Sequence, residues 1–279
     1  MTTRTWHDRR VIVAGGTAGF GLAMARHLAA AGARVLVVGR SSEGVRQALD
    51  GRAADDRMRG IAADLSRPGE AGRVVGEALR MLGGVDDLFF CVGRSGRGEI
   101  LKTDADELRA YFDANVSSAV EITQAVADEV AAARGHLVYI GSLAGKLVTP
   151  FMGPYSVAKS ALAAYVDAVR LEMAPRGAHV LLVSPGPIRR ADDDPRAADA
   201  ADRYAADVER CGLPAEALRP GGTRALPQID PDRLAGQVLA ACRRRTSELV
   251  VPRKAALLAG LIEWCPEWGR RLLARAVRR

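Results

Sequence analysis

Apolar runs of four to six residues alternate along the chain with longer segments of helical period. The runs are rich in Val, Ile and Leu, which is typical of strands that are buried on both faces of a parallel sheet. We therefore expect a doubly wound α/β fold with about seven parallel strands. The predicted strands cover residues 11–15, 34–39, 60–64, 87–92, 136–141, 179–184 and 248–252.

The segments between these runs show the period of amphipathic helices. No shift in composition divides residues 1–252, so we expect a single domain. Within it, residues 187–230 are rich in Pro, Gly and charge, which predicts a partly helical lid beside the active site. The predicted helices cover 19–31, 67–82, a long stretch within 105–133, 155–174 and 231–243.

Residues 253–279 predict a C-terminal extension of two amphipathic helices. Pro266 is suited to the first turn of the second helix, where Trp268 and Leu272 lie one turn apart and arginines occupy the other side. The extension is too short and too charged to span a bilayer. Two interpretations stay open: its apolar stripe packs against the domain or a second subunit, or it lies peripherally in an anionic membrane surface.

The formal net charge of +7 comes mostly from this extension, which has seven Lys or Arg against two Glu. No aromatic stacking platform accompanies the basic residues, so nucleic-acid binding is not expected. Four cysteines without a CxxC pair and four histidines without ligand spacing predict a reducing compartment and no metal site. The polar residues 1–10 carry no apolar leader, which predicts a cytoplasmic protein.

A glycine cluster joins the first predicted strand to the first helix. Gly15, Gly19 and Gly21 stand in the sequence AGGTAGFGLAMA at residues 14–25. Glycines here allow a tight turn and the close approach of a pyrophosphate, which the free N–H groups of the helix attract. The cluster therefore predicts a dinucleotide site of the Rossmann type, the alternative being a plain strand-to-helix turn.

The end of the second predicted strand indicates which dinucleotide is bound. An acidic residue there would accept hydrogen bonds from the adenosine ribose, but the sequence reads Gly39, Arg40, Ser41 and Ser42. A guanidinium beside hydroxyl groups suits a 2′-phosphate. We expect NADP(H) to be preferred over NAD(H), the alternative being that Arg40 only begins a solvated loop.

Tyr155 and Lys159 lie four residues apart at the start of a predicted helix, so they share one face of it. An ammonium near a phenol favours the phenolate and makes the tyrosine a usable acid or base near neutrality. Ser142 follows the strand over 136–141, where its hydroxyl is placed to bind a carbonyl oxygen. The alternatives are a solvent-facing Tyr–Lys pair and a serine that caps a turn.

In order and spacing, these motifs resemble those of the short-chain dehydrogenase/reductase family over residues 10–190. The resemblance implies that Tyr155 is the general acid/base and that Ser142 binds the reacting oxygen. It also implies that Lys159 holds the nicotinamide ribose and that Asn115 supports a proton-relay water. A homodimer or homotetramer is the assembly that such a resemblance implies.

The resemblance extends to the cofactor. It implies that Asp64 lies beside the adenine and that Gly93 flanks the adenosine ribose. The expected cofactor-binding residues are Gly15, Thr17, Gly19, Phe20, Gly21, Arg40, Ser41, Asp64, Leu65, Gly93, Tyr155, Lys159, Pro185, Gly186 and Ile188.

The sequence departs from the family's pattern in three places. Ala14 stands where a threonine usually precedes the first glycine, and residues 90–93 read Phe-Cys-Val-Gly in place of Asn-Asn-Ala-Gly. Arg190 replaces a threonine that lies near the nicotinamide amide in the family. We therefore expect rearranged cofactor contacts, with Arg189 or Arg190 meeting cofactor phosphates, an anionic substrate or solvent.

The resulting hypothesis is a reductase that uses NADPH to convert a ketone or aldehyde to an alcohol, or catalyses the reverse reaction. The apolar C-terminal extension makes a hydrophobic or lipid-like substrate plausible. The alternative is a non-catalytic protein of the same fold that senses NADP(H).

Overall fold

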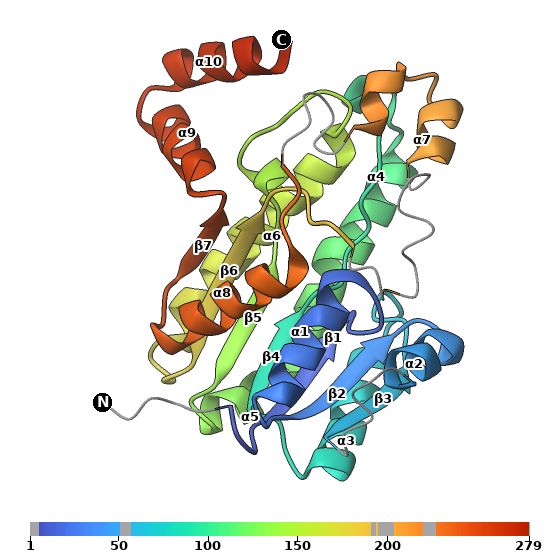
Figure 1. The fold of residues 1–279 in the computed structure, drawn as a ribbon, viewed down its shortest axis with the longest axis vertical. Helices are drawn as coiled ribbons and strands as arrows, with labels where there is room; N and C mark the ends of the chain where they lie inside the picture. The colour runs from blue at the N-terminus through green and yellow to red at the C-terminus, as the bar shows by residue number, and fades with distance from the viewer. Residues whose placement is uncertain (1–5, 51–56, 191–193, 195–203, 220–226, 279) are drawn as a thin grey trace.

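The computed structural model describes residues 6–50, 57–190, 194, 204–219 and 227–278 (Figure 1). At its centre lies a seven-stranded sheet in which every strand pair is parallel. The predicted doubly wound sheet is therefore confirmed. The strands are β1 (Arg10–Ala14), β2 (Arg34–Gly39), β3 (Met58–Ala62), β4 (Asp87–Phe90), β5 (His136–Ile140), β6 (His179–Pro185) and β7 (Glu248–Val251).

The strand order is β3-β2-β1-β4-β5-β6-β7. The chain builds the sheet outward from β1 to β3 on one side and then from β4 to β7 on the other. At the point where the order reverses, the connections leave β1 and β4 on opposite faces. This reversal opens a crevice at the carboxyl ends of the central strands, which is where open α/β sheets bind ligands.

Helices cover both faces of the sheet (Figure 1). The helices are α1 (Gly19–Ala30), α2 (Ser42–Leu49), α3 (Glu70–Leu82), α4 (Ala105–Phe112), α5 (Ser118–Ala132), α6 (Gly153–Met173), α7 (Ala205–Arg210), α8 (Pro231–Arg243), α9 (Arg253–Trp264) and α10 (Pro266–Arg278). Successive strand residues face opposite layers, so Ile12 belongs to the apolar core under α3, α5 and α6, whereas Val13 belongs to the core under α1 and α8.

Several elements differ from the sequence predictions: α3 begins three residues later than the predicted 67–82, and β4 ends two residues earlier than the predicted 87–92. Strand β3 begins and ends two residues earlier than the predicted 60–64. Helix α2 was not predicted; it has only eight residues, and its start depends on the Ser41 hydroxyl, which accepts a hydrogen bond from the N–H of Gly44 at 3.1 Å. The long helix expected within 105–133 is interrupted by a π-helical turn, η2 (Asp113–Ser117), between α4 and α5.

The region expected to form a lid, residues 187–230, is described in part. Residues 191–193, 195–203 and 220–226 of it lie outside the described residues. The described remainder contains α7 and a short 3₁₀ turn, η5 (Ala215–Leu218), which agrees with partly helical structure.

The two predicted C-terminal helices are present as α9 and α10. Figure 1 shows α9 continuing from β7 and α10 turned across its far end. The two helices pack closely at Gly269, where a Cβ atom would lie 2.6 Å from the Cα of Ile262, so only glycine fits there. Among the described helices, none combines the length and apolar character needed to cross a bilayer.

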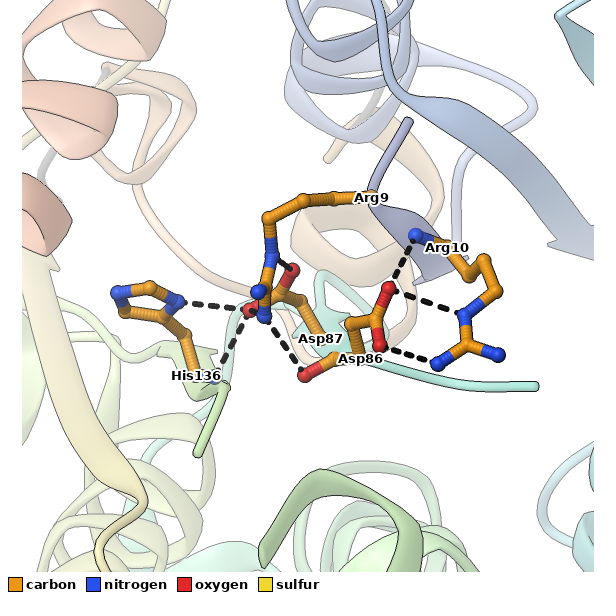
Figure 2. Close-up of polar contacts among 5 residues, drawn as sticks. All are labelled: Arg9, Arg10, Asp86, Asp87 and His136. Carbon is orange, nitrogen blue, oxygen red and sulfur yellow. Dashed lines mark hydrogen bonds and ion pairs between the residues drawn. The ribbon is translucent and has the colours of Figure 1, made fainter. Parts of the chain in front are cut away.

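A buried polar cluster joins β1, β4 and β5 at their amino ends (Figure 2). The fully buried carboxylate of Asp87 accepts hydrogen bonds from the Arg9 guanidinium at 2.5 and 2.7 Å and from the backbone N–H of His136 at 2.8 Å. Nδ1 of His136 also lies 2.7 Å from this carboxylate. Burial alone would raise the pKa of Asp87, but the hydrogen bonds from His136 and Arg9 outweigh it and hold the pKa below its usual range.

His179 on β6 extends this cluster to a fourth strand. Its ring stands edge-on to the ring of His136, with centroids 5.3 Å apart, and its Nε2 lies 2.9 Å from the carbonyl oxygen of Thr246. Burial, together with the nearby His136, lowers the pKa of His179 to about 4. The amino edge of the sheet is therefore a polar, titratable region, on the edge opposite the ligand crevice.

Candidate active site

A large cleft lies at the carboxyl ends of the strands. Its volume is about 2010 Å³, whereas ordinary small-molecule pockets measure roughly 300–1,000 Å³. Its wall contains the glycine-rich turn, the ends of β2 and β3, the start of α6 and the segment that follows β6. The cleft therefore has room for a dinucleotide and a second molecule together.

The glycine-rich turn places the first turn of α1 in this cleft. Gly15 and Gly19 adopt left-handed φ values of +77° and +56°, which favour glycine. The residue before the helix, Ala18, has no side chain that can cap it. Instead, the buried carboxylate of Asp194 accepts a hydrogen bond from the N–H of Gly19 at 2.5 Å. An anionic oxygen is thus accommodated at this helix terminus, as the electrostatics of helix ends favour.

The end of β2 presents Arg40 to the cleft, as an exposed side chain. Ser41 lies outside the lining residues, with its hydroxyl engaged as the cap of α2. Asp64, which also lines the cleft, accepts hydrogen bonds from the hydroxyl and the N–H of Ser66 at 2.6 and 3.1 Å. The Ser66 hydroxyl chiefly, with a contribution from the positive charge of Arg40, lowers the pKa of Asp64.

Ser142, Tyr155 and Lys159 line the same cleft. The Ser142 hydroxyl accepts a hydrogen bond from the N–H of Ala144 at 3.1 Å, where the chain turns into a 3₁₀ segment, η3 (Leu143–Gly145). Tyr155 and Lys159 project from the first turns of α6, and Nζ of Lys159 lies 5.9 Å from the centre of the Tyr155 ring. The structure therefore brings together the hydroxyl, the phenol and the ammonium that the sequence motifs singled out.

The ammonium of Lys159 is buried and held in place. It donates a hydrogen bond to the carbonyl oxygen of Ile140 at 3.0 Å, at the carboxyl end of β5. Burial lowers its pKa to about 8. The side chain therefore still carries a proton at neutral pH, next to a phenol whose ionisation a positive charge favours.

Asn115 lies behind these residues, in the π-helical turn η2 and outside the lining of the cleft. Its Nδ2 donates hydrogen bonds to the carbonyl oxygens of Tyr111 and Arg94 at 2.9 and 3.0 Å. Its Oδ1 is buried, and within the described residues no donor reaches it. A buried acceptor of this kind usually marks the position of a bound water or ligand.

Gly93 is the point where Asn115 and Lys159 meet. A Cβ atom at Gly93 would lie 2.6 Å from Oδ1 of Asn115 and 3.1 Å from Nζ of Lys159. The absence of a side chain therefore lets the loop that follows β4 pass close to both buried polar atoms. This glycine was expected to flank the cofactor; its proximity to Asn115 was not foreseen.

The remaining expected cofactor residues, Thr17, Phe20, Gly21, Leu65, Pro185, Gly186 and Ile188, all line the cleft. The segment after β6 is tied to residue 229: Ile229 donates to the carbonyl oxygen of Pro187 at 2.8 Å, and Arg189 donates its N–H to that of Ile229 at 2.9 Å. Arg189 and Arg190 both line the cleft, and the Arg189 guanidinium pairs with Asp230 at 3.0 Å.

Two features of the site gave no recognisable signal in the sequence. One is Asp194 on the N–H of Gly19, which the sequence places 175 residues away. The other is Arg97, whose buried guanidinium donates to the carbonyl oxygens of Ala217 and Arg219 at 2.7 and 3.1 Å and lies 3.6 Å from the centre of the Tyr204 ring. Arg97 thereby fixes the segment that contains α7 and η5 against the loop after β4.

Comparison with known proteins agrees with this geometry. A family model described as short chain dehydrogenase matches residues 9–199. A Xenopus tropicalis protein named "Dehydrogenase/reductase SDR family member 7B" is 34% identical over 191 residues, which are 65% of this chain and 62% of that protein. The "Ketoacyl reductase HetN" of a Nostoc strain is 30% identical over 188 residues, which are 67% of this chain and 65% of that protein.

The chain thus spans less than two thirds of the length of these curated relatives. Among solved structures, a short-chain dehydrogenase from Streptomyces avermitilis is similar with a TM-score of 0.74 at 25% identity. That similarity covers 95% of this chain and 98% of the other. The similarity therefore extends over nearly the whole length of both chains.

Proposed function

Because the chain belongs to the short-chain dehydrogenase family, whose members use an NAD(P)(H) cofactor, we propose that it reduces a ketone or aldehyde to an alcohol with NADPH, or catalyses the reverse. One observation carries this proposal. Ser142, Tyr155 and the buried ammonium of Lys159 line one cleft with the glycine-rich turn of a dinucleotide-binding sheet.

The residues present fit such a cofactor. The N–H of Gly19 already donates to a carboxylate oxygen, so an anion is accommodated where a pyrophosphate is expected. Arg40 at the end of β2, with no carboxylate beside it on that strand, supports the preference for the 2′-phosphate of NADP(H). When bound, the reduced nicotinamide supplies the hydride.

The chain's own residues handle the oxygen and the proton. Ser142 orients the carbonyl oxygen, and Tyr155 gives it a proton as charge develops there. The Lys159 ammonium favours the phenolate that remains. Oδ1 of Asn115, which no donor of the described part of the chain reaches, is suited to accept a hydrogen bond from a water that returns the proton.

The substrate and the location of the protein are part of the proposal. Residues 1–252 form one catalytic domain with a lid at 187–230, and the substrate is hydrophobic or lipid-like. The outer surface of the C-terminal helices supports peripheral contact with an anionic membrane, because Trp264 and Trp268 are 90% and 71% exposed among basic residues. The protein is otherwise cytoplasmic, as a homodimer or homotetramer.

The decisive experiment compares the wild type with Tyr155→Phe. Purified protein is given NADPH with aliphatic, acyl-chain and steroid ketones, and NADPH oxidation is followed by absorbance. We expect at least one ketone to be reduced by the wild type, and the variant to lose about a hundredfold or more in kcat because the proton donor is gone. If NADPH binds but no ketone is turned over above the variant, the protein is an NADP(H)-sensing protein instead.

A further inference from the structure

The C-terminal helices form a wall of the active-site cleft. Their inner surface faces the same space as Ser142 and Tyr155. It is distinct from the outer surface that carries Trp264 and Trp268, neither of which lines the cleft. The inner-surface residues are Lys254, Ala255 and Leu258 of α9 and Leu272, Leu273 and Arg275 of α10.

The strand order assigns this wall to the substrate end of the cleft. Arg40 follows β2, whereas α9 follows β7, and five strand-to-strand steps separate these two strands. At about 4.8 Å a step, they are roughly 24 Å apart. Ser142 follows β5, which is only two steps from β7. Lys254, at the start of α9, is therefore remote from the expected 2′-phosphate and lies on the side of the sheet that carries Ser142.

The inner surface combines apolar and cationic groups. Leu258 and Leu273 are half-buried, and Leu272 keeps 43% of its surface exposed. Lys254 and Arg275 are exposed, and neither forms an ion pair or hydrogen bond with another described residue. Three leucines and two cations that have no ion-pair partner among the described residues thus line one wall of the cleft. Such a wall matches a molecule that has an alkyl chain and an anionic group.

We infer that the inner surface of α9 and α10 is a substrate subsite for an amphiphile with a straight alkyl chain and one anionic group. The chain packs on Leu258, Leu272 and Leu273, and the anion pairs with Lys254 and Arg275. The inference rests on the proposed reductase function, since it concerns the far end of that function's substrate. It explains why the extension follows the last strand of the sheet beside the catalytic residues.

The test measures binding of decyl phosphate below its critical micelle concentration by isothermal titration calorimetry, with NADP⁺ present. Decyl glucoside supplies the same chain without the charge, and ethyl phosphate supplies the charge without the chain. We expect decyl phosphate to bind at least about tenfold more tightly than either. In the double variant Lys254→Gln/Arg275→Gln, this advantage over decyl glucoside should disappear.

Arg271→Gln is the matched control, because Arg271 lies on α10 and is exposed but does not line the cleft. This variant should bind decyl phosphate like the wild type. Equal binding of the three probes, or equal binding of decyl phosphate by the double variant and the wild type, would overturn the subsite. NADPH binding by fluorescence is recorded for each protein, so a failure of the subsite with intact NADPH binding leaves the proposed function standing.

Discussion

At the scale of single residues, the position of Lys159 determines what the site can do. Its ammonium is removed from water by burial, yet a backbone carbonyl at 3.0 Å and the face of Tyr155 stabilise it. The sequence predicted that lysine and tyrosine share a helix face, since four residues separate them. It did not predict the bond to Ile140 or the orphaned Oδ1 of Asn115, because both depend on contacts between distant segments.

Arg40 provides the residue-scale prediction. Arg40→Asp should weaken NADPH binding by about tenfold or more, because a carboxylate repels the 2′-phosphate that the guanidinium would bind. NADH binding should change by less than about threefold. Fluorescence titration with both nucleotides measures the two affinities.

The matched control is Arg80→Asp. Arg80 is an exposed arginine of α3 that is paired only with nearby Glu77 among the described residues and does not line the cleft. The Arg80→Asp variant should bind NADPH and NADH with unchanged affinity. Equal weakening of NADPH and NADH binding by Arg40→Asp would remove the basis for a preference between the two nucleotides.

At the scale of elements, the strands and long helices were predictable because they are buried and periodic. Helix α8 covers the predicted residues 231–243. A Pro stands in its first turn, and the side chain of Asp230 caps it. Helix α2 was not predicted because it has a single weakly apolar stripe over eight residues. The π-helical turn η2 was not predicted because a one-residue shift in backbone hydrogen bonding leaves the spacing of hydrophobic residues almost unchanged.

The buried His179, at the amino edge of the sheet, predicts how the stability of the protein depends on pH. His179 has a pKa of about 4 in the folded protein and about 6.5 when unfolded. Between these values the unfolded chain binds more protons, so the free energy of unfolding is at its full value above about pH 6.5 and falls as the pH drops towards 4. The loss should be on the order of 3 kcal/mol or less.

Urea unfolding at about pH 7 and about pH 5 measures this loss. The variant His179→Asn has no titratable side chain at position 179. Its free energy of unfolding should therefore fall less between the two pH values than that of the wild type. His7→Asn is the control, because the His7 side chain is 63% exposed. A loss in His179→Asn as large as in the wild type would show that the destabilisation has another origin.

At the scale of the whole molecule, the chemistry lies at one edge of the sheet and the buried charge network at the other. The C-terminal helices continue the chemical edge beyond β7 and have one surface toward the cleft and another toward solvent. The sequence predicted that these helices exist and are amphipathic. It could not reveal that one surface lines the cleft while the other faces solvent, because that depends on how α10 turns across α9.

The outer surface leads to a prediction about membranes. The wild type should sediment with vesicles that contain phosphatidylglycerol and much less with pure phosphatidylcholine vesicles, because exposed tryptophans and arginines favour an anionic interface. Trp264→Ser/Trp268→Ser should reduce this binding by about tenfold. Leu171→Ser serves as control, since Leu171 is equally accessible at 77% but lies on α6.

Size-exclusion chromatography of the same three proteins distinguishes membrane contact from packing of the outer surface against a second subunit. If the tryptophan variant changes its oligomeric state and keeps its vesicle binding, the outer surface is a subunit contact instead. Unchanged sedimentation with an unchanged oligomeric state would contradict both uses of these residues.

The contact between Asp194 and the first helix has one more implication. The Asp194 carboxylate is a counter-anion for the amide of Gly19, across 175 residues of sequence. A pyrophosphate that binds this amide must displace the carboxylate, so nucleotide binding replaces one anion with another. Its measured affinity is then a difference between two contacts, and a modest value would be compatible with a well-fitting pocket.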